Sequence, residues 1–278
     1  MPNIAIIGLV GRSMFFDVPR FHFGGETIHA SGFYEEWGGK GFNQAVAAAR
    51  QGAKVSFLGA VGMDDVEPLS RFCEGEHVDC LLSSGLSPSA RAAILTDGSG
   101  ETRVTVFPGA ALSVADVECF RGRIEAADFL LLNNEVPEEV NLRASEIAAA
   151  KGVKILFNPA PARPLPTDLA LRVFLFTPNE FEEAALGDVS CEVVTTLGAR
   201  GCRIRSTGEV VPAVSCGKPV DSTGAGDTFT AVLSVRLAEG MALSDACREA
   251  NAAAAYSVTV RYVMPSLPRR CGISPNNV

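Results

Sequence analysis

The sequence lacks the features that mark several classes of protein. It contains no GxxxxGK(S/T) and no GxGxxG pattern, so a P-loop and a dinucleotide-binding fold both lose their usual support. Its formal net charge is −8 over 278 residues, which gives a nucleic-acid partner no electrostatic support. It has no uninterrupted apolar run of membrane length and no basic segment before the strand-like run at Ile4. We therefore expect no membrane partner, no signal peptide and a cytoplasmic location.

Metal-binding and disulfide patterns are also missing. The three histidines, His22, His29 and His77, show no ligand spacing, so we expect no histidine-based metal site. The eight cysteines include no CxxC pair, which favours free thiols over disulfides or zinc. Hydrophobic residues make up 47% and charged residues 20%, a balance typical of a soluble globular protein.

The most informative stretch is Asp221–Phe229, a small-residue turn that runs into a helical pattern. Gly224, Ala225 and Gly226 have almost no side chain, so their backbone N–H groups can approach an anion at the start of a helix. Asp227 then places a carboxylate beside that anion, as expected for a base that accepts the proton of an attacking hydroxyl group. The alternative interpretation is an ordinary turn with a capping aspartate.

A second glycine-rich stretch, Gly38–Gln44, precedes an alanine-rich helix expected over Asn43–Gln51. The glycines let the backbone come close to a ligand, while Lys40 and Asn43 supply a positive charge and an amide that donates and accepts. Taken alone, this stretch is equally compatible with a purely structural helix entry.

Strands and helices alternate along much of the chain, which indicates a parallel sheet with crossover helices. The aromatic-rich segment Met14–Trp37 interrupts the alternation, and the turn Asp97–Gly100 signals a hairpin. Together they suggest a β lid, as a flap over a site or as an oligomer contact. We predict one domain over residues 1–278, with lid segments at about 12–37 and 88–108. The expected elements are strands at Ile4–Val10, Val55–Val61, Ala90–Thr96, Thr102–Phe107, Phe129–Asn133, Lys154–Phe157 and Val173–Phe176, and a helix at about Pro137–Lys151.

Polar residues follow four consecutive strands of the expected sheet. Ligands of open parallel sheets bind at the carboxyl ends of strands, so these tips are expected to line one crevice. The tips are Asn133–Glu135, Asn158–Pro161, Thr177–Glu180 and Thr196–Gly198.

The two glycine-rich stretches, Gly38–Ala45 and Asp221–Phe229, resemble the two signatures of the ribokinase family, also called the PfkB carbohydrate kinases. Asn158–Arg163, Thr177–Glu180 and Thr196–Gly201 are similar to that family in order and spacing, so the resemblance covers nearly the whole chain. It implies a three-layer αβα ribokinase-like fold with a mainly parallel sheet and a small β-sheet lid. It also implies phosphoryl transfer from ATP-Mg²⁺ to a hydroxymethyl group.

The resemblance implies roles for individual residues. Asp227 resembles the catalytic base, and the amides of Gly224, Ala225 and Gly226 resemble the donors that hold the transferring phosphoryl group. The implied substrate-binding residues are Gly11, Ser13, Gly39, Lys40, Gly41, Asn43, Glu135 and Asp227. The implied nucleotide-binding residues are Asn179, Thr196, Gly198, Gly201 and Asn251. Asn179 and Glu182 resemble the element that orders the water shell of Mg²⁺, and Asp221, Thr223 and Ser266 resemble part of a monovalent-cation (K⁺) site.

Three departures from the family pattern affect these expectations. Ser13 stands where the family has a sugar-binding aspartate, and a serine cannot replace that charge, which weakens the case for ribose and leaves a sugar or nucleoside as the expected acceptor. Asp17 takes the role of that aspartate only if the loop is rebuilt. The interval from Glu182 to Val193 is short, so a helix is expected to be missing and one flank of the sheet to be bare. Tyr262 replaces a glycine of the cation loop, which leaves K⁺ activation open.

These features favour an ATP-dependent small-molecule kinase. The alternative is a catalytically silent sensor of a sugar or nucleotide, motivated by Ser13 and the shortened interval. A dinucleotide oxidoreductase is disfavoured because its glycine fingerprint is absent. The aromatic flap Phe15–Trp37 is also expected to form a homodimer interface.

Overall fold

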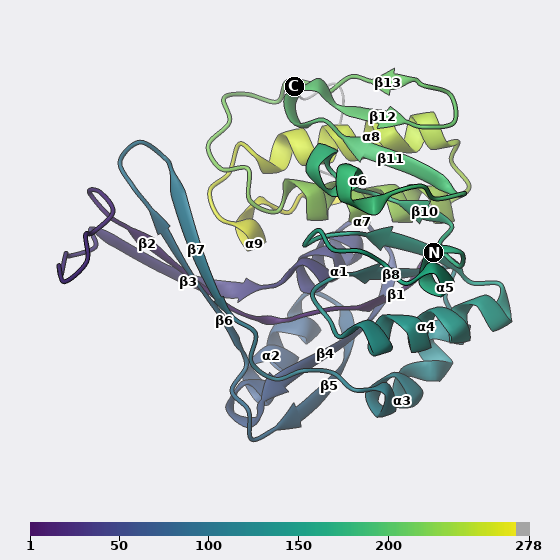
Figure 1. The fold of residues 1–278 in the computed structure, drawn as a ribbon, viewed down its shortest axis with the longest axis horizontal. Coiled ribbons are helices and arrows are strands. Elements are labelled where there is room, and N and C mark those ends of the chain that lie inside the picture. The colour runs from purple at the N-terminus through teal and green to yellow at the C-terminus, as the bar shows by residue number, and fades with distance from the viewer. Residues whose placement is uncertain (271–278) are drawn as a thin grey trace.

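The computed structural model describes residues 1–270, and within them nine strands form one large sheet (Figure 1). All neighbours from β11 to β5 pair in parallel, whereas β12 and β13 are antiparallel and form one edge. In spatial order the strands are β13 (Val210–Val211), β12 (Cys202–Ile204), β11 (Glu192–Thr196), β10 (Leu175–Phe176), β9 (Lys154–Asn158), β8 (Phe129–Asn133), β1 (Asn3–Ile7), β4 (Lys54–Gly62) and β5 (Val78–Gly85).

Helices cover both faces of this sheet and complete three layers. One face packs against α1 (Lys40–Arg50), α2 (Met63–Gly75), α7 (Ala225–Ala238), α8 (Leu243–Ser257) and α9 (Val263–Ser266). The other face packs against α3 (Val114–Glu125), α4 (Glu138–Lys151), α5 (Thr167–Ala170) and α6 (Glu180–Leu186). The central strands are apolar on both faces, as expected for a parallel sheet between two helical layers.

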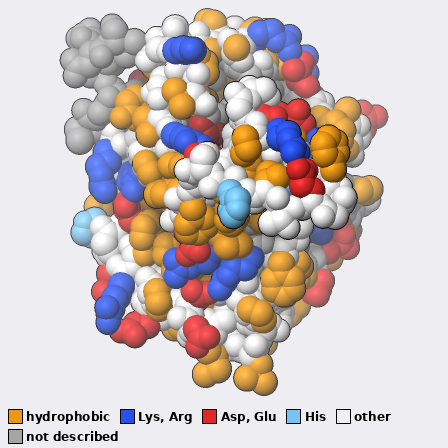
Figure 2. All heavy atoms as spheres, turned by 90° about the vertical axis from the view of Figure 1, so that its left-hand side faces the viewer, with side chains coloured by type: hydrophobic (Ala, Val, Ile, Leu, Met, Phe, Trp, Pro, Cys, Tyr) orange, Lys and Arg blue, Asp and Glu red, His pale blue; other side chains and the backbone are white. Residues whose placement is uncertain are grey.

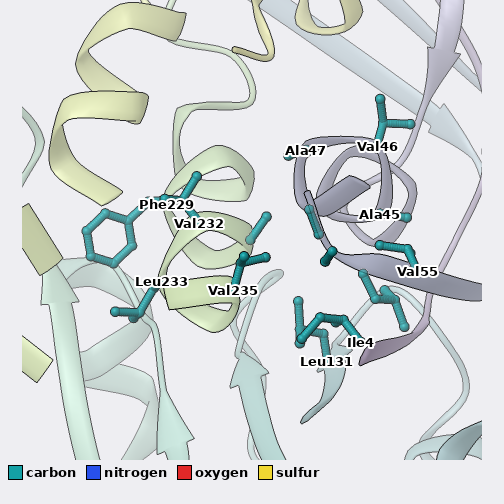
Figure 3. Packing of buried hydrophobic residues seen from close by; sticks show 14 of the residues in the cluster. Ile4, Ala45, Val46, Ala47, Val55, Leu131, Phe229, Val232, Leu233 and Val235 are labelled. Atoms are coloured by element: carbon teal, nitrogen blue, oxygen red, sulfur yellow. The ribbon is translucent and has the colours of Figure 1, made fainter. Parts of the chain in front are cut away.

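The packing of α1 and α7 on the sheet determines where the two glycine-rich stretches meet. Ala45 of α1 and Val235 of α7 lie over Ile4 and Leu131 of the central strands, and all four are fully buried (Figure 3). Because each helix begins directly after its glycine-rich stretch, both stretches lie at the carboxyl ends of the strands.

A second, four-stranded sheet projects from the side of the molecule where the carboxyl ends of the strands lie, at the left of Figure 1. We call it the lid; its strands, in spatial order, are β3 (Gly32–Gly38), β2 (Gly11–Asp17), β6 (Ala90–Thr96) and β7 (Thr102–Phe107). The hairpin between β6 and β7 closes at the expected turn, where Gly100 N–H donates to Asp97 O at 3.0 Å and Gly100 takes a φ of 86°. The main pairing of the lid, β2 with β6, is parallel and joins distant segments.

Several expected elements differ from the structure. The strand expected at Ile4–Val10 ends at Ile7, and the helix expected to begin at Asn43 begins at Lys40. The strand expected at Val173–Phe176 is only Leu175–Phe176, because Val173 still belongs to the turn after α5 and donates to Ala170 O. The flank expected to be bare carries α6, a helix of seven residues, and half-buried Leu186 and Val189 pack on the core there. One short helix therefore covers the flank that was expected to be bare.

No helix within residues 1–270 is long and apolar enough to cross a membrane. Of the eight cysteines, Cys271 lies outside the described residues.

Candidate active site

The start of α7 has a conformation that only glycine adopts easily. Gly224 precedes the helix with φ 79° and ψ −2°, the left-handed region. A Cβ at Gly224 would lie 2.6 Å from Cγ1 of Val263, so the site has no room for a side chain. Asp227 follows in the first helical turn and points into the protein, with 6% of its surface exposed.

Two amides from α1 hold the carboxylate of Asp227. Asn43 Nδ2 donates to Oδ2 at 2.7 Å, and Gln44 Nε2 donates to Oδ1 at 3.3 Å. Burial raises the pKa of Asp227, while the charge of Lys40 and the two amides oppose that rise. A fixed carboxylate made more basic by burial has the properties required of a general base.

Lys40 and Glu135 interact with each other and with the charge of Asp227. The backbone N–H of Lys40 donates to Glu135 Oε2 at 2.7 Å, and the N–H of Glu135 donates to Asn133 Oδ1 at 2.9 Å. The carboxylates of Asp227 and Glu135 raise the pKa of Lys40, so its ammonium stays charged. Burial raises the pKa of Glu135 to about 7, although Lys40 opposes it. One cation thus lies close to two carboxylates, one in the first turn of α7 and one just after the end of β8.

Glycines at the start of α1 allow the helix to approach the residues that follow β1. A Cβ on Gly41 would lie 2.6 Å from the Cα of Gly8, and a Cβ on Gly39, at φ 110°, would lie 2.3 Å from Leu9 O. These glycines therefore have a structural role. By allowing α1 to pack closely, they also let Asn43 reach Asp227.

Ser13 lies on β2 of the lid, opposite Glu36 of β3. Gly11, on the same face of β2, packs so tightly that a Cβ would lie 2.3 Å from Ala90 O. Asp17 forms an ion pair with Arg261 and is held at the outer end of the strand. At the Ser13 position the lid therefore offers a hydroxyl group and no carboxylate from β2.

The strand tips lie side by side and are tied to one another. Asn158 Nδ2 donates to Thr177 O at 2.8 Å, Thr196 N–H donates to Pro178 O at 2.8 Å, and Asn134 Nδ2 donates to Pro161 O at 3.0 Å. Beside them a cavity of about 550 Å³ brings together Thr196, Gly198, Gly201 and Asn251 with Ala225 and Gly226. Apolar walls such as Phe229 and Val258 suit a flat ring, and the glycine-rich end suits phosphates.

Asn179 is not in the lining of this cavity; it begins α6. Its side chain accepts from Glu182 N–H at 2.8 Å, and Glu182 Oε2 accepts from Asn179 N–H at 2.9 Å. This reciprocal capping box fixes both side chains. The negative charge of Glu182 also contributes to the raised pKa of Lys40.

Two groups of residues at the candidate site were not predicted from the sequence. Gln44 holds Asp227, and its position next to Asn43 was the only signal for it. The irregular segment Ala213–Gly217 and Pro219 form one wall of the cavity, and no periodicity or motif marks them.

The raised pKa of Glu135 predicts a pH-dependent effect of Glu135→Gln. Proton binding to Glu135 stabilises the folded state fully below the ordinary pKa of 4.5, and this contribution is lost as the pH rises through about 7. The glutamine still accepts from Lys40 N–H but does not titrate, so the variant should gain stability relative to wild type between pH 5 and pH 8. We expect a gain on the order of a few kcal/mol, since one pKa unit corresponds to about 1.4 kcal/mol.

Thermal unfolding of both proteins at pH 5 and pH 8 measures this gain. Glu74→Gln, at an exposed glutamate of α2, is the control and should show no such pH-dependent difference. An equal difference in Tm at both pH values for Glu135→Gln would contradict the assignment.

A buried carboxylate in the first turn of a helix that begins at glycine amides, next to a nucleotide-sized cavity on a three-layer αβα fold, is typical of a small-molecule kinase. The comparisons with known proteins agree. Residues 1–270 match the pfkB family carbohydrate kinase model, and the chain belongs to that family. It is therefore a carbohydrate kinase, a phosphotransferase that acts on an alcohol group.

Ribokinases are among its relatives. The ribokinase of Haemophilus influenzae is 32% identical over 293 residues, which cover 96% of each chain. The solved ribokinase of Giardia lamblia superimposes with a TM-score of 0.87 at 28% identity, covering 98% of this chain and 97% of the other. The ribokinase of Arabidopsis thaliana, solved with ribose and ATP, gives a TM-score of 0.86 at 26% identity, covering 98% and 97%. The expected family and ribokinase-like fold are thus confirmed.

Proposed function

We propose that this kinase transfers the γ-phosphoryl group of ATP to a hydroxymethyl group of a sugar or nucleoside-like molecule. The observation that carries the proposal is the position of Asp227, which lies in the first turn of the helix whose start, Ala225 and Gly226, lines the cavity. The same carboxylate accepts hydrogen bonds from Asn43 and Gln44 of α1, and the charge of Lys40, the first residue of that helix, acts on it. One base therefore lies between a site for an acceptor and a site for a nucleotide.

The acceptor is held by Lys40, Asn43 and Glu135 in this proposal. Within the described residues, Asn43 Oδ1 and Gln44 Oε1 are buried without a hydrogen-bond partner. Buried polar atoms are normally satisfied, so hydroxyl groups of a bound acceptor are their natural partners. Ser13 adds a neutral hydroxyl from the lid, which favours an acceptor that needs no carboxylate there.

In the reaction, Asp227 accepts the proton of the acceptor hydroxyl group as its oxygen attacks the γ-phosphorus and ADP leaves. The backbone N–H groups at Gly224–Gly226 stabilise the negative charge of the transferring group, and the Lys40 ammonium supports Asp227 in its ionised form.

ATP is the proposed donor, supported by the ATP bound to the Arabidopsis ribokinase. Mg²⁺, when bound, neutralises phosphate charge. The residues fit a role in ordering its water shell, because the capping box fixes the Asn179 amide and the Glu182 carboxylate at the start of α6.

The test is ADP release from ATP-Mg²⁺ across a panel of pentoses, hexoses, phosphosugars and nucleosides, with Asp227→Asn in parallel. Acceptor-dependent ADP release that disappears in the variant is the expected result. No release with any acceptor, together with calorimetric binding of nucleotide or sugar, would instead support a silent sensor. We place the enzyme in the cytoplasm.

We also propose a homodimer formed through the lid. Val104 and Val106 lie two residues apart on one face of β7, and each is 57% exposed. Figure 2 shows the end of the molecule from which the lid projects, where hydrophobic side chains lie exposed among charged ones. Exposed apolar side chains gathered on a protruding sheet are typical of an interface.

Light scattering at micromolar concentration should therefore give twice the chain mass of 29.2 kDa. The double change Val104→Lys, Val106→Lys should give a monomer, while Val210→Lys, at a 52% exposed valine of β13, should not. A wild-type monomer would refute the lid dimer.

A further inference from the structure

The segment 261–264, which leads into α9, is held by two carboxylates. Three consecutive backbone N–H groups donate to them: Tyr262 to Asp221 Oδ2 at 3.1 Å, Val263 to Glu36 Oε1 at 2.8 Å, and Met264 to Glu36 Oε2 at 2.9 Å. Glu36 belongs to strand β3 of the lid and is only 6% exposed. One side chain of the lid, Glu36, thus accepts two of the three hydrogen bonds and links the lid to segment 261–264.

The same segment contacts the proposed anion hole. Val263 packs on Gly224 so closely that a Cβ there would lie 2.6 Å from Val263 Cγ1. Asp221, which holds Tyr262, uses its other oxygen, Oδ1, to accept from Thr223 N–H at 2.9 Å. A displacement of segment 261–264 would therefore reach the Gly224 backbone both through Val263 and through Asp221.

Tyr262 adds a third attachment. Its φ of 68° is unusual for an aromatic residue, so the surrounding contacts must hold it there. Its ring stacks on Tyr34 of β3, with centroids 4.0 Å apart, and meets Phe15 of β2 edge-on at 5.1 Å. Arg261, directly before it, pairs with Asp17 of β2. Within the described residues, strands β2 and β3 of the lid thus both contact segment 261–264.

These contacts do not fit a K⁺ ion held by Asp221, Thr223 and Ser266. A hard cation requires converging oxygen atoms, but both oxygens of Asp221 already accept N–H groups, Oδ1 from Thr223 and Oδ2 from Tyr262. The hydroxyl of Ser266 donates a hydrogen bond to Val263 O at 2.9 Å, within its own turn. The carboxylate of Asp221 is therefore used to hold backbone N–H groups of its own loop and of segment 261–264.

We propose that Glu36 and Tyr262 are positioning residues that hold the anion-hole loop in its working conformation through segment 261–264, without a monovalent cation. The kinetic part of this inference rests on the proposed kinase function. The structural part, that Glu36 and Tyr262 order the loop 221–226 and that K⁺ does not, can be tested separately.

Glu36→Gln removes one of the two carboxylate oxygens that accept N–H groups while keeping the size of the side chain. The matched control is Glu35→Gln: Glu35 is the preceding residue of β3, lies on the opposite face of the strand and pairs with Arg12. With ribose, or a panel compound that is phosphorylated better, as the acceptor, we expect Glu36→Gln to lower kcat at least about 10-fold and to change the KM for ATP less than about 3-fold. Tyr262→Ala should behave in the same way, whereas Tyr262→Phe, which keeps the ring, should retain wild-type kcat.

Hydrogen exchange gives the readout that needs no acceptor. Amides of 221–226 and 262–264 should exchange faster in Glu36→Gln and Tyr262→Ala than in wild type, Glu35→Gln or Tyr262→Phe. Replacing K⁺ by choline should leave wild-type exchange, and wild-type kcat within about 2-fold, unchanged.

Slower exchange of 221–226 in K⁺ than in choline would overturn the inference, as would unchanged exchange and kcat in Glu36→Gln. A wild-type protein that phosphorylates nothing would refute the proposed function, while the exchange experiment would still decide whether Glu36 and Tyr262 order the loop.

Discussion

Asp227→Asn should lower kcat by at least about 100-fold, the scale expected when a general base is removed. The amide cannot accept the hydroxyl proton, and it lacks the negative charge that Lys40 now balances. Its size is unchanged, so binding of ATP should be retained. Steady-state kinetics with the best acceptor of the panel, and calorimetry with an ATP analogue, measure the two effects separately.

The variant should fold, because its neighbours can adapt. Asn43 and Gln44 both donate to Asp227 and both keep a buried oxygen without a partner within residues 1–270. Either side-chain amide can turn by 180° and offer that oxygen to the new NH₂ group. Thermal unfolding should therefore change little.

Asp64→Asn is the matched control, since Asp64 also lies in the first turn of a helix but is exposed on α2. It should retain wild-type kcat. An Asp227→Asn enzyme that is folded and keeps more than about a tenth of wild-type kcat would remove Asp227 from the role of base.

The elements that the sequence predicted well are those with strong local signals. The strands expected at Ala90–Thr96, Thr102–Phe107 and Phe129–Asn133 coincide with β6, β7 and β8. A short apolar or β-branched run between clear turn residues leaves little freedom in its limits. The helix expected to begin at Asn43 begins three residues earlier, at Lys40. Gly39, with a φ of 110°, is the last non-helical residue before it.

The lid and its attachment depend on contacts between distant parts of the chain. Strands β2 and β6 pair in parallel although about eighty residues separate them, and no local pattern specifies such a register. Glu35 and Glu36 are identical in type and adjacent, yet one is exposed and the other buried against Val263. Only the tertiary structure decides which glutamate faces the segment 261–264.

The role proposed for Asp221–Phe229 could be predicted from the sequence because the residues that it needs are close together in the chain. Gly224 and Asp227 lie within one turn, so the sequence already placed an anion site beside a carboxylate. The partners of that carboxylate, Asn43 and Gln44, come from a helix more than 180 residues earlier, and the contact requires α1 to pack against α7.

Gly224→Ala should lower kcat by about 10- to 100-fold, because displacement of catalytic groups by about 1 Å can cost 100-fold. The new Cβ would lie 2.6 Å from Val263 Cγ1, and Val263 cannot retreat easily because its N–H is bound to Glu36. The loop must therefore move, and with it the amides proposed to hold the phosphoryl group. Rapid-quench measurement of the first turnover would show whether the loss lies in the chemical step.

Gly152→Ala separates this displacement from simple backbone strain. Gly152 ends α4 with φ 70° and ψ 18°, close to the conformation of Gly224, but an added Cβ there meets nothing within 4 Å. A left-handed alanine should cost each variant on the order of 1 kcal/mol of stability. Gly224→Ala should lose more, because its Cβ also meets Val263, and only Gly224→Ala should lose kcat. Equal kcat in the two variants would show that contact with Val263 does not set the geometry of the anion hole. Loss of kcat in Gly224→Ala together with faster exchange at 262–264 would show that strain at the helix start is transmitted back to the segment that Glu36 holds.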